Sequence, residues 1–141
     1  MGGAVAVAVA AVFVWLGMVL AISFLEAPLK FRAPGVTLQI GLGIGRLVFR
    51  ALNACEIALA AVVVVCFAIT PPAVSIAIAA AVAVITLLAQ VLAVRPRLTQ
   101  RSDAVLAGGE GPRSHMHWVY VGLETVKVVA LLIAGVLLLA A

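Results

Sequence analysis

The sequence predicts an all-α, polytopic membrane protein, a bundle of four transmembrane helices. Its composition is the first observation, because 67% of its 141 residues are hydrophobic and its mean hydropathy is +1.35, whereas a soluble domain is about half apolar. The second observation is the presence of four apolar runs, each near the ~20 residues that a helix needs to cross a bilayer. They cover about residues 4–27, 47–69, 73–94 and 117–139. We therefore expect a single domain over residues 1–141, with the lipid bilayer as its partner.

The connection after the first span, residues 28–46, is predicted to contain a structure of its own. Pro28 and Pro34 end the first helix. The stretch from residue 36 is apolar but too long to join the second span as one straight helix. We expect a short interfacial helix between the first two spans, followed by a bend at a cluster of glycines. These are Gly41, Gly43 and Gly45. Two of them, four residues apart, also fit close helix packing.

Apart from Lys127 in the last span, the basic residues belong to two of the three connections. Those after the first span are Lys30, Arg32, Arg46 and Arg50, and those after the third are Arg95, Arg97, Arg101 and Arg113. The connection after the second span has no charge. The positive-inside rule then predicts cytoplasmic loops at 28–46 and 95–116, with both termini outside. The net charge of +4 is thus explained by topology, and no motif indicates a nucleic-acid partner.

Every predicted helix carries a polar stripe. The stripes follow helical spacing of three or four residues, and their members are Ser23, Glu26 and Lys30, then Asn53 and Glu56, then Thr86 and Gln90, then His117, Tyr120, Glu124 and Lys127. Counted from the outer ends at ~1.5 Å per residue, Glu56 lies about 21 Å deep and Glu124 about 22 Å deep. Thr86 and Gln90 lie at a similar level, about 20 Å and 25 Å deep.

Polar groups inside a bilayer nearly always face the interior of the bundle. We therefore expect the stripes to meet in one polar cavity that opens toward the cytoplasm. Its predicted lining is Glu26, Asn53, Glu56, Gln90, Tyr120, Glu124 and Lys127.

Three uses of this cavity are open. One is a divalent metal site, because helix bundles build such sites from carboxylates and imidazoles; its ligands would be Glu26, Glu56, His117 and Glu124. A second is proton or cation handling, in which a buried glutamate gains and loses a proton. A third is purely structural pairing. The pairs would be Glu124 with Lys127, Glu26 with Lys30, and Glu56 with Arg50 or Lys127.

These uses lead to several functional hypotheses. The first is a small membrane protein that handles a cation, a proton-coupled solute or a metal. The alternatives are a metal- or haem-dependent membrane oxidoreductase, with any haem held between two chains, and a non-catalytic subunit or assembly factor of a membrane complex. A bundle this small often works as a homo-oligomer or as a subunit. The sequence has no P-loop, Ser-His-Asp arrangement or zinc-ligand spacing, so it gives no support to a kinase or hydrolase.

A group of short motifs suggests a family. Ala27, Pro28 and Phe31 end the first span, Gly45 and Phe49 open the second before Glu56, and His115 or His117 begins the last. This pattern resembles the transmembrane-protein-205-like family of small four-helix membrane proteins. The resemblance implies four helices and membrane residence, and it implies no mechanism. Glu26, Lys30 and the pair of Glu124 and Lys127 depart from the family pattern.

Overall fold

A computed structural model gives the fold of the chain and describes residues 1–107 and 116–141. The helical elements are α1 (Gly3–Val19), η1 (Leu20–Glu26), α2 (Ala27–Leu29), η2 (Lys30–Arg32), α3 (Leu38–Ile69), α4 (Val74–Ala89), η3 (Gln90–Val94), α5 (Arg95–Leu106) and α6 (Met116–Ala140). Within the described residues they join into four long helices, each long and apolar enough to cross a membrane. The prediction of an all-α protein with four such helices is confirmed. His115 and the rest of residues 108–115 lie outside the described residues.

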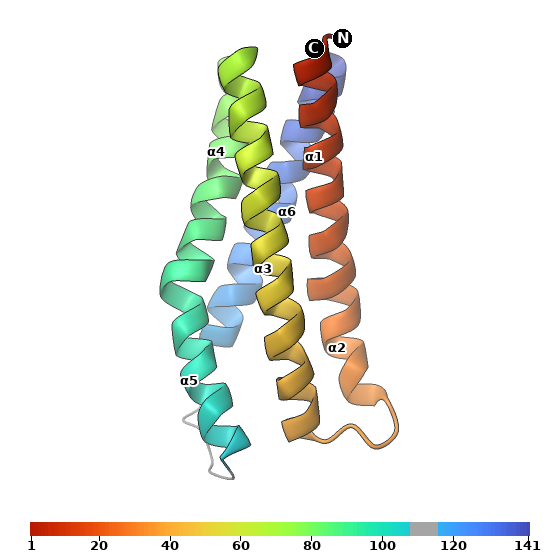
Figure 1. Cartoon of the computed structure of the whole chain (residues 1–141), viewed down its shortest axis with the longest axis vertical. Coiled ribbons are helices and arrows are strands. Elements are labelled where there is room, and N and C mark those ends of the chain that lie inside the picture. The colour runs from red at the N-terminus through yellow and green to blue at the C-terminus, as the bar shows by residue number, and fades with distance from the viewer. Residues whose placement is uncertain (108–115) are drawn as a thin grey trace.

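The four long helices run alternately up and down, and both termini lie at the same end of the bundle (Figure 1). α1 packs against α3 and α6, and α6 packs against α4, whereas α3 and α4 touch each other much less. The core is apolar and dominated by small and branched side chains. Its most buried members include Ala8, Val12, Trp15, Val63, Ala83, Leu87 and Leu131. The core thus runs along the inward faces of all four long helices.

The structure does not show a separate interfacial helix before the second span. Residues from Leu38 onward belong to α3 itself, which begins where the Thr37 hydroxyl accepts a hydrogen bond from the Ile40 amide at 3.2 Å. The glycines lie inside this helix, where they permit close packing. A methyl group on Gly41 would overlap the Phe31 ring, and one on Gly45 would lie 3.0 Å from Lys30 Nζ. No break is needed, because a helix tolerates glycine when tertiary packing supports it.

The second predicted loop also begins with a helix. α4 continues through the π-helical η3 into α5, which extends to Leu106. Pro96 lies within this continuous helix, directly after the π-helical η3, and such local π-helical adjustment accommodates a proline inside a helix. α5 is held against α3 by two polar contacts. Arg46 Nη1 lies 2.5 Å from Asp103 Oδ1, and Gln39 Nε2 donates to the Val105 carbonyl oxygen at 3.3 Å.

Candidate functional site

The centre of the candidate site is Lys127, whose side chain is completely buried. Its Nζ lies 2.5 Å from Glu56 Oε1 and 2.6 Å from Glu124 Oε1. It also donates a hydrogen bond to Gln90 Oε1 at 2.7 Å. An ammonium group has three hydrogens to donate, so the protein supplies a partner for each. We call Glu56, Lys127 and Glu124 the acid–lysine centre.

Neighbouring helices supply further donors to the two carboxylates. Trp15 Nε1 donates to Glu56 Oε1 at 2.9 Å. Ser23 Oγ donates to Glu124 Oε2 at 2.6 Å, and Gln90 Nε2 donates to Glu124 Oε1 at 3.3 Å. All four long helices therefore contribute to one network. The network also links α3 to η3, through Glu56 and Gln90, although α3 and α4 pack little against each other.

Two π-helical segments flank the centre. Ser23 belongs to η1 and Gln90 is the first residue of η3. π-helical turns are rare and occur often at functional sites, because the wider turn changes the direction of the side chains that follow. Each of these segments contributes a side chain to the network, so the irregular backbone coincides with the polar contacts.

The acid–lysine centre carries an imbalance of charge. It holds two carboxyl groups and one ammonium group, and the three side chains are 0%, 1% and 0% exposed for Glu56, Glu124 and Lys127. With all three ionised, its formal charge is −1. Two buried acceptors nearby, Glu56 Oε2 and Asn53 Oδ1, have no hydrogen-bond partner. Buried acceptors without a donor are uncommon, because each has lost its water.

A second cationic group lies nearer the end opposite the termini, and we call it the Arg95 cluster. The Arg95 guanidinium lies 4.8 Å from the centre of the Phe49 ring and 4.6 Å from that of Tyr120. Lys30 Nζ also lies over the Phe49 ring, 5.7 Å from its centre. Arg95 Nε, Arg95 Nη2 and Tyr120 Oη are buried and have no hydrogen-bond partner. The aromatic faces of Phe49 and Tyr120 therefore hold the Arg95 guanidinium, and two of its nitrogens have no acceptor.

The structure brings together only part of the predicted cavity lining. Gln90 contacts Glu124 and Lys127, and Tyr120 joins through its carbonyl oxygen, 3.4 Å from Gln90 Nε2. Glu56 pairs with Lys127 rather than Arg50, which is exposed. Three other predicted polar residues are not hydrogen-bonded to the network. They are Glu26, which pairs with Lys30 at 3.8 Å, Asn53, whose buried Oδ1 has no hydrogen-bond partner, and Thr86, which donates to the carbonyl oxygen of Val82.

The four predicted metal ligands are not gathered around one point. His117 is exposed, with its ring 5.6 Å from that of Trp118, and Glu26 lies with Lys30. In residues 1–107 and 116–141, no three His, Cys, Asp or Glu side chains form a group that could hold a metal ion. The Lys127 ammonium occupies the position between Glu56 and Glu124 that a bound cation would take.

Sequence reasoning overlooked two members of the network. Trp15 was not assigned to any site, and Ser23 was placed in a stripe but not in the cavity lining. The signal was present, because residues eight apart lie on one helical face. Trp15 therefore shares the face of Ser23, and both point at acids from other helices.

No family model, no curated protein and no solved structure matches this chain. The segments that carry the family resemblance lie side by side in the fold, since Phe31 packs on Gly41 and Lys30 lies against Gly45 and the Phe49 ring. Membership of the transmembrane-protein-205-like family stays a prediction.

Proposed function

We propose that this chain is a multi-pass membrane protein that couples a proton to the movement of a small solute, with the acid–lysine centre as its proton site. One observation carries the proposal. Two buried carboxyl groups, Glu56 and Glu124, share one buried ammonium group, Lys127, so the centre has a formal charge of −1 when all three are ionised. A net charge is costly inside a bilayer, and a single proton removes it. The centre is therefore a place where proton uptake and release change the energy of the bundle.

The surface of the bundle supports residence in a membrane. Large apolar side chains are exposed along all four long helices, among them Val14, Leu47, Val65, Ile85 and Leu132. Water would make this surface unfavourable, whereas lipid would not. The proposed orientation places the basic connections in the cytoplasm and both termini outside, because arginine and lysine favour the cytoplasmic side.

A proton path to the centre starts at η1. Ser23 is hydrogen-bonded to Glu124, and Glu26 ends the same seven-residue segment, with its side chain 36% exposed. A hydroxyl can both donate and accept, so Ser23 is able to pass a proton toward the buried carboxyl group. Glu26 would then be the group that exchanges protons with the aqueous phase.

The Arg95 cluster gives the proposed solute a chemical class. Arg95 has buried guanidinium nitrogens without acceptors, and Lys30 lies on the same aromatic ring. A guanidinium group matches the geometry of carboxylate and phosphate oxygens. We therefore propose a small anion as the solute, bound beside Tyr120, whose carbonyl oxygen is hydrogen-bonded to Gln90 of the centre.

A non-catalytic structural role is the second candidate. It is favoured by the way the network joins all four long helices and connects α3 to η3. In that case the acids and Lys127 stabilise the bundle, and the protein acts as a subunit or assembly factor. Nothing in the described residues favours a metal- or haem-dependent oxidoreductase in the same way.

Proton flux into vesicles separates the two candidates. The purified protein is reconstituted with a trapped pH-sensitive dye, and inorganic phosphate is added outside as the anion, with choline as the cationic comparison. We expect phosphate-dependent acidification that is lost in Glu56→Gln and kept in the matched control Asp103→Asn, which neutralises an exposed acid. Equal flux in Glu56→Gln and wild type would contradict the proton role. A folded wild-type protein without flux would favour the structural candidate.

A further inference from the structure

Two acceptor atoms on one face of α3 are buried without a donor. Glu56 is 0% exposed and Asn53 is 7% exposed, and neither Glu56 Oε2 nor Asn53 Oδ1 has a hydrogen-bond partner. The two residues are three apart, a spacing that brings their Cβ atoms to about 5–6 Å on a helix. Their side chains are thus neighbours, and each has a buried oxygen that lacks a hydrogen-bond donor.

We infer that the exchangeable proton of the acid–lysine centre resides on Glu56 Oε2 and is donated from there to Asn53 Oδ1. The proton located in this way is the one in the proposed function, and its role in transport rests on that function. In this step, one proton from the aqueous phase forms an O–H bond with the carboxylate, and no other covalent bond changes. One proton then satisfies both unpaired acceptors and brings the formal charge of the centre to zero.

The surroundings of the two carboxyl groups favour Glu56 over Glu124. Both oxygens of Glu124 already accept hydrogen bonds, from Lys127 and Gln90 at Oε1 and from Ser23 at Oε2. Glu56 uses only Oε1, which faces Lys127 and Trp15. A carboxylate is stabilised by each hydrogen bond that it accepts, so the surroundings favour the anion at Glu124 and leave the proton to Glu56.

The charged groups that act on Glu56 are few. From α6 they are Lys127, in direct contact, and Glu124, on the far side of the ammonium. α1 presents the neutral Trp15, and η3 presents the neutral Gln90, which bonds to Lys127. In the proposal, the ion pair of Lys127 and Glu124 is kept, and the proton is gained and lost at Glu56.

The two glutamates should respond differently to the same substitution. In Glu56→Gln, the amide can donate to Asn53 and the remaining oxygen can still accept from Trp15 and Lys127, so the variant copies the protonated state. In Glu124→Gln, Lys127 loses its permanent counter-ion, and Glu56 must give up its proton and face Asn53 as an anion. We expect Glu56→Gln to keep the unfolding temperature of the wild type and Glu124→Gln to lower it.

Infrared spectroscopy of the full chain in lipid tests the location of the proton. We expect the carbonyl band of a protonated carboxylic acid at neutral pH, removed by Glu56→Gln. Its frequency should shift in Asn53→Leu, which removes the acceptor, and stay unchanged in Ser23→Ala, which removes the hydrogen bond to Glu124 instead. Circular dichroism confirms that each variant is folded.

Two outcomes would overturn the inference. The absence of an acid band would mean that Glu56 is ionised and that the Asn53 side chain is rotated so that its Nδ2–H donates a hydrogen bond to Glu56 Oε2, because the two orientations of a side-chain amide are readily interchanged. A band that shifts with Ser23→Ala and not with Asn53→Leu would assign the proton to Glu124. The flux measurement is separate: a Glu56 band without proton flux in vesicles would keep the inference and refute the transport function.

Discussion

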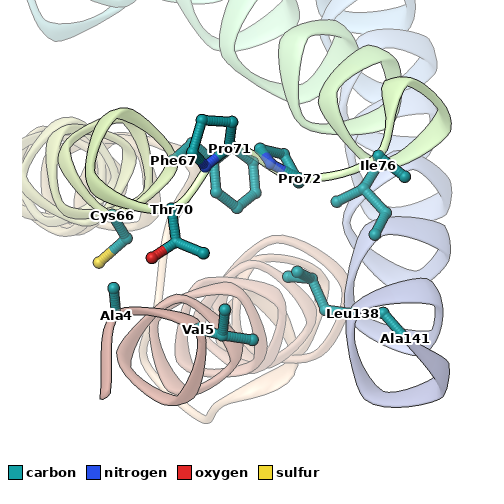
Figure 2. Close-up of a pocket in the computed structure, with 11 residues that line it drawn as sticks. Ala4, Val5, Cys66, Phe67, Thr70, Pro71, Pro72, Ile76, Leu138 and Ala141 are labelled. Carbon is teal, nitrogen blue, oxygen red and sulfur yellow. The ribbon is translucent and has the colours of Figure 1, made fainter. Parts of the chain in front are cut away.

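The acid–lysine centre and the terminal end of the bundle hold the same four helices together in different ways. At the centre, Lys127 is surrounded by acceptors at 2.5 to 2.7 Å. At the terminal end, apolar side chains enclose a cavity of about 190 Å³, where Pro71 and Pro72 of the α3–α4 connection face Val5 of α1 (Figure 2). The rest of its lining is Ala4, Cys66, Phe67, Thr70, Ala73, Ile76, Leu138 and Ala141.

The difference is between directional hydrogen bonds, which hold the helices together at the centre, and non-directional apolar contacts, which hold them together at the terminal end. Hydrogen bonds between buried charges require particular atoms at particular distances, and a missing partner leaves a costly unpaired group. Apolar contacts are non-directional and individually small, so the terminal end can leave space unfilled. The centre therefore fixes how the helices are arranged, and the terminal end tolerates variation.

The largest effect is expected from Lys127→Met, which leaves two buried carboxyl groups without their cation. Breaking a buried ion pair by removing one partner costs about 3–5 kcal/mol of unfolding free energy. The matched control is Arg46→Met, whose partner Asp103 is 57% exposed and whose loss should cost about 1 kcal/mol or less. Denaturant titration of both variants in the same detergent measures the difference. Equal losses would mean that the centre is no more important than a surface pair.

A glycine substitution on α6 tests whether the apolar packing is tolerant everywhere. In Gly135→Ala, the added carbon would lie 2.7 Å from Phe13 Cζ, and such overpacking costs about 1–3 kcal/mol. Gly122→Ala adds the same atom where nothing lies within 4 Å. Thermal unfolding should therefore show a loss for Gly135→Ala only. Two variants with the same unfolding temperature would show that Phe13 moves aside without cost.

Trp15→Phe isolates one hydrogen bond of the centre while keeping an aromatic ring. The Glu56 oxygen loses the donor at 2.9 Å, and side-chain hydrogen bonds within membranes contribute about 0.6 kcal/mol on average, with a maximum near 1.7 kcal/mol. Trp118→Phe is the control, because Trp118 is 72% exposed. The free energy of unfolding, measured with a denaturant, should be lower for Trp15→Phe than for Trp118→Phe by that amount. A larger loss for Trp118→Phe would contradict a stabilising hydrogen bond from Trp15 to Glu56.

The smallest effect is expected at the terminal cavity. Ala4→Val adds two methyl groups beside unfilled space, and such filling changes stability by about 1 kcal/mol or less, in the favourable direction. Ala8→Val, one turn further along α1, is the control, because Ala8 is 0% exposed and already packed. Its unfolding temperature should fall. If Ala4→Val were as harmful as Ala8→Val, the terminal end would be as tightly specified as the core.

Parts of the site could be foreseen from helical periodicity. The spacing of Glu124 and Lys127 predicted their pairing, and the depth count placed Glu56 and Gln90 at the same level, where the structure joins them through Lys127. The spacing of Trp15 and Ser23 puts both on one helical face, but it does not show that this face meets Glu56. The extent of α5 was missed, because its arginines are typical of a loop and its contacts with α3 lie far away in sequence.

The sequence by itself determined four apolar helices and the position of each polar side chain along its helix, because length, hydropathy and helical rise are local properties. Only the tertiary structure decided that Lys127 pairs with both Glu56 and Glu124, that Trp15 and Ser23 donate hydrogen bonds to these acids, and that Arg95 lies against the rings of Phe49 and Tyr120. The physical reason is that each helix can be rotated about its own axis relative to its neighbours. Periodicity shows which residues share a face, but the packing of one helix on another decides which faces meet.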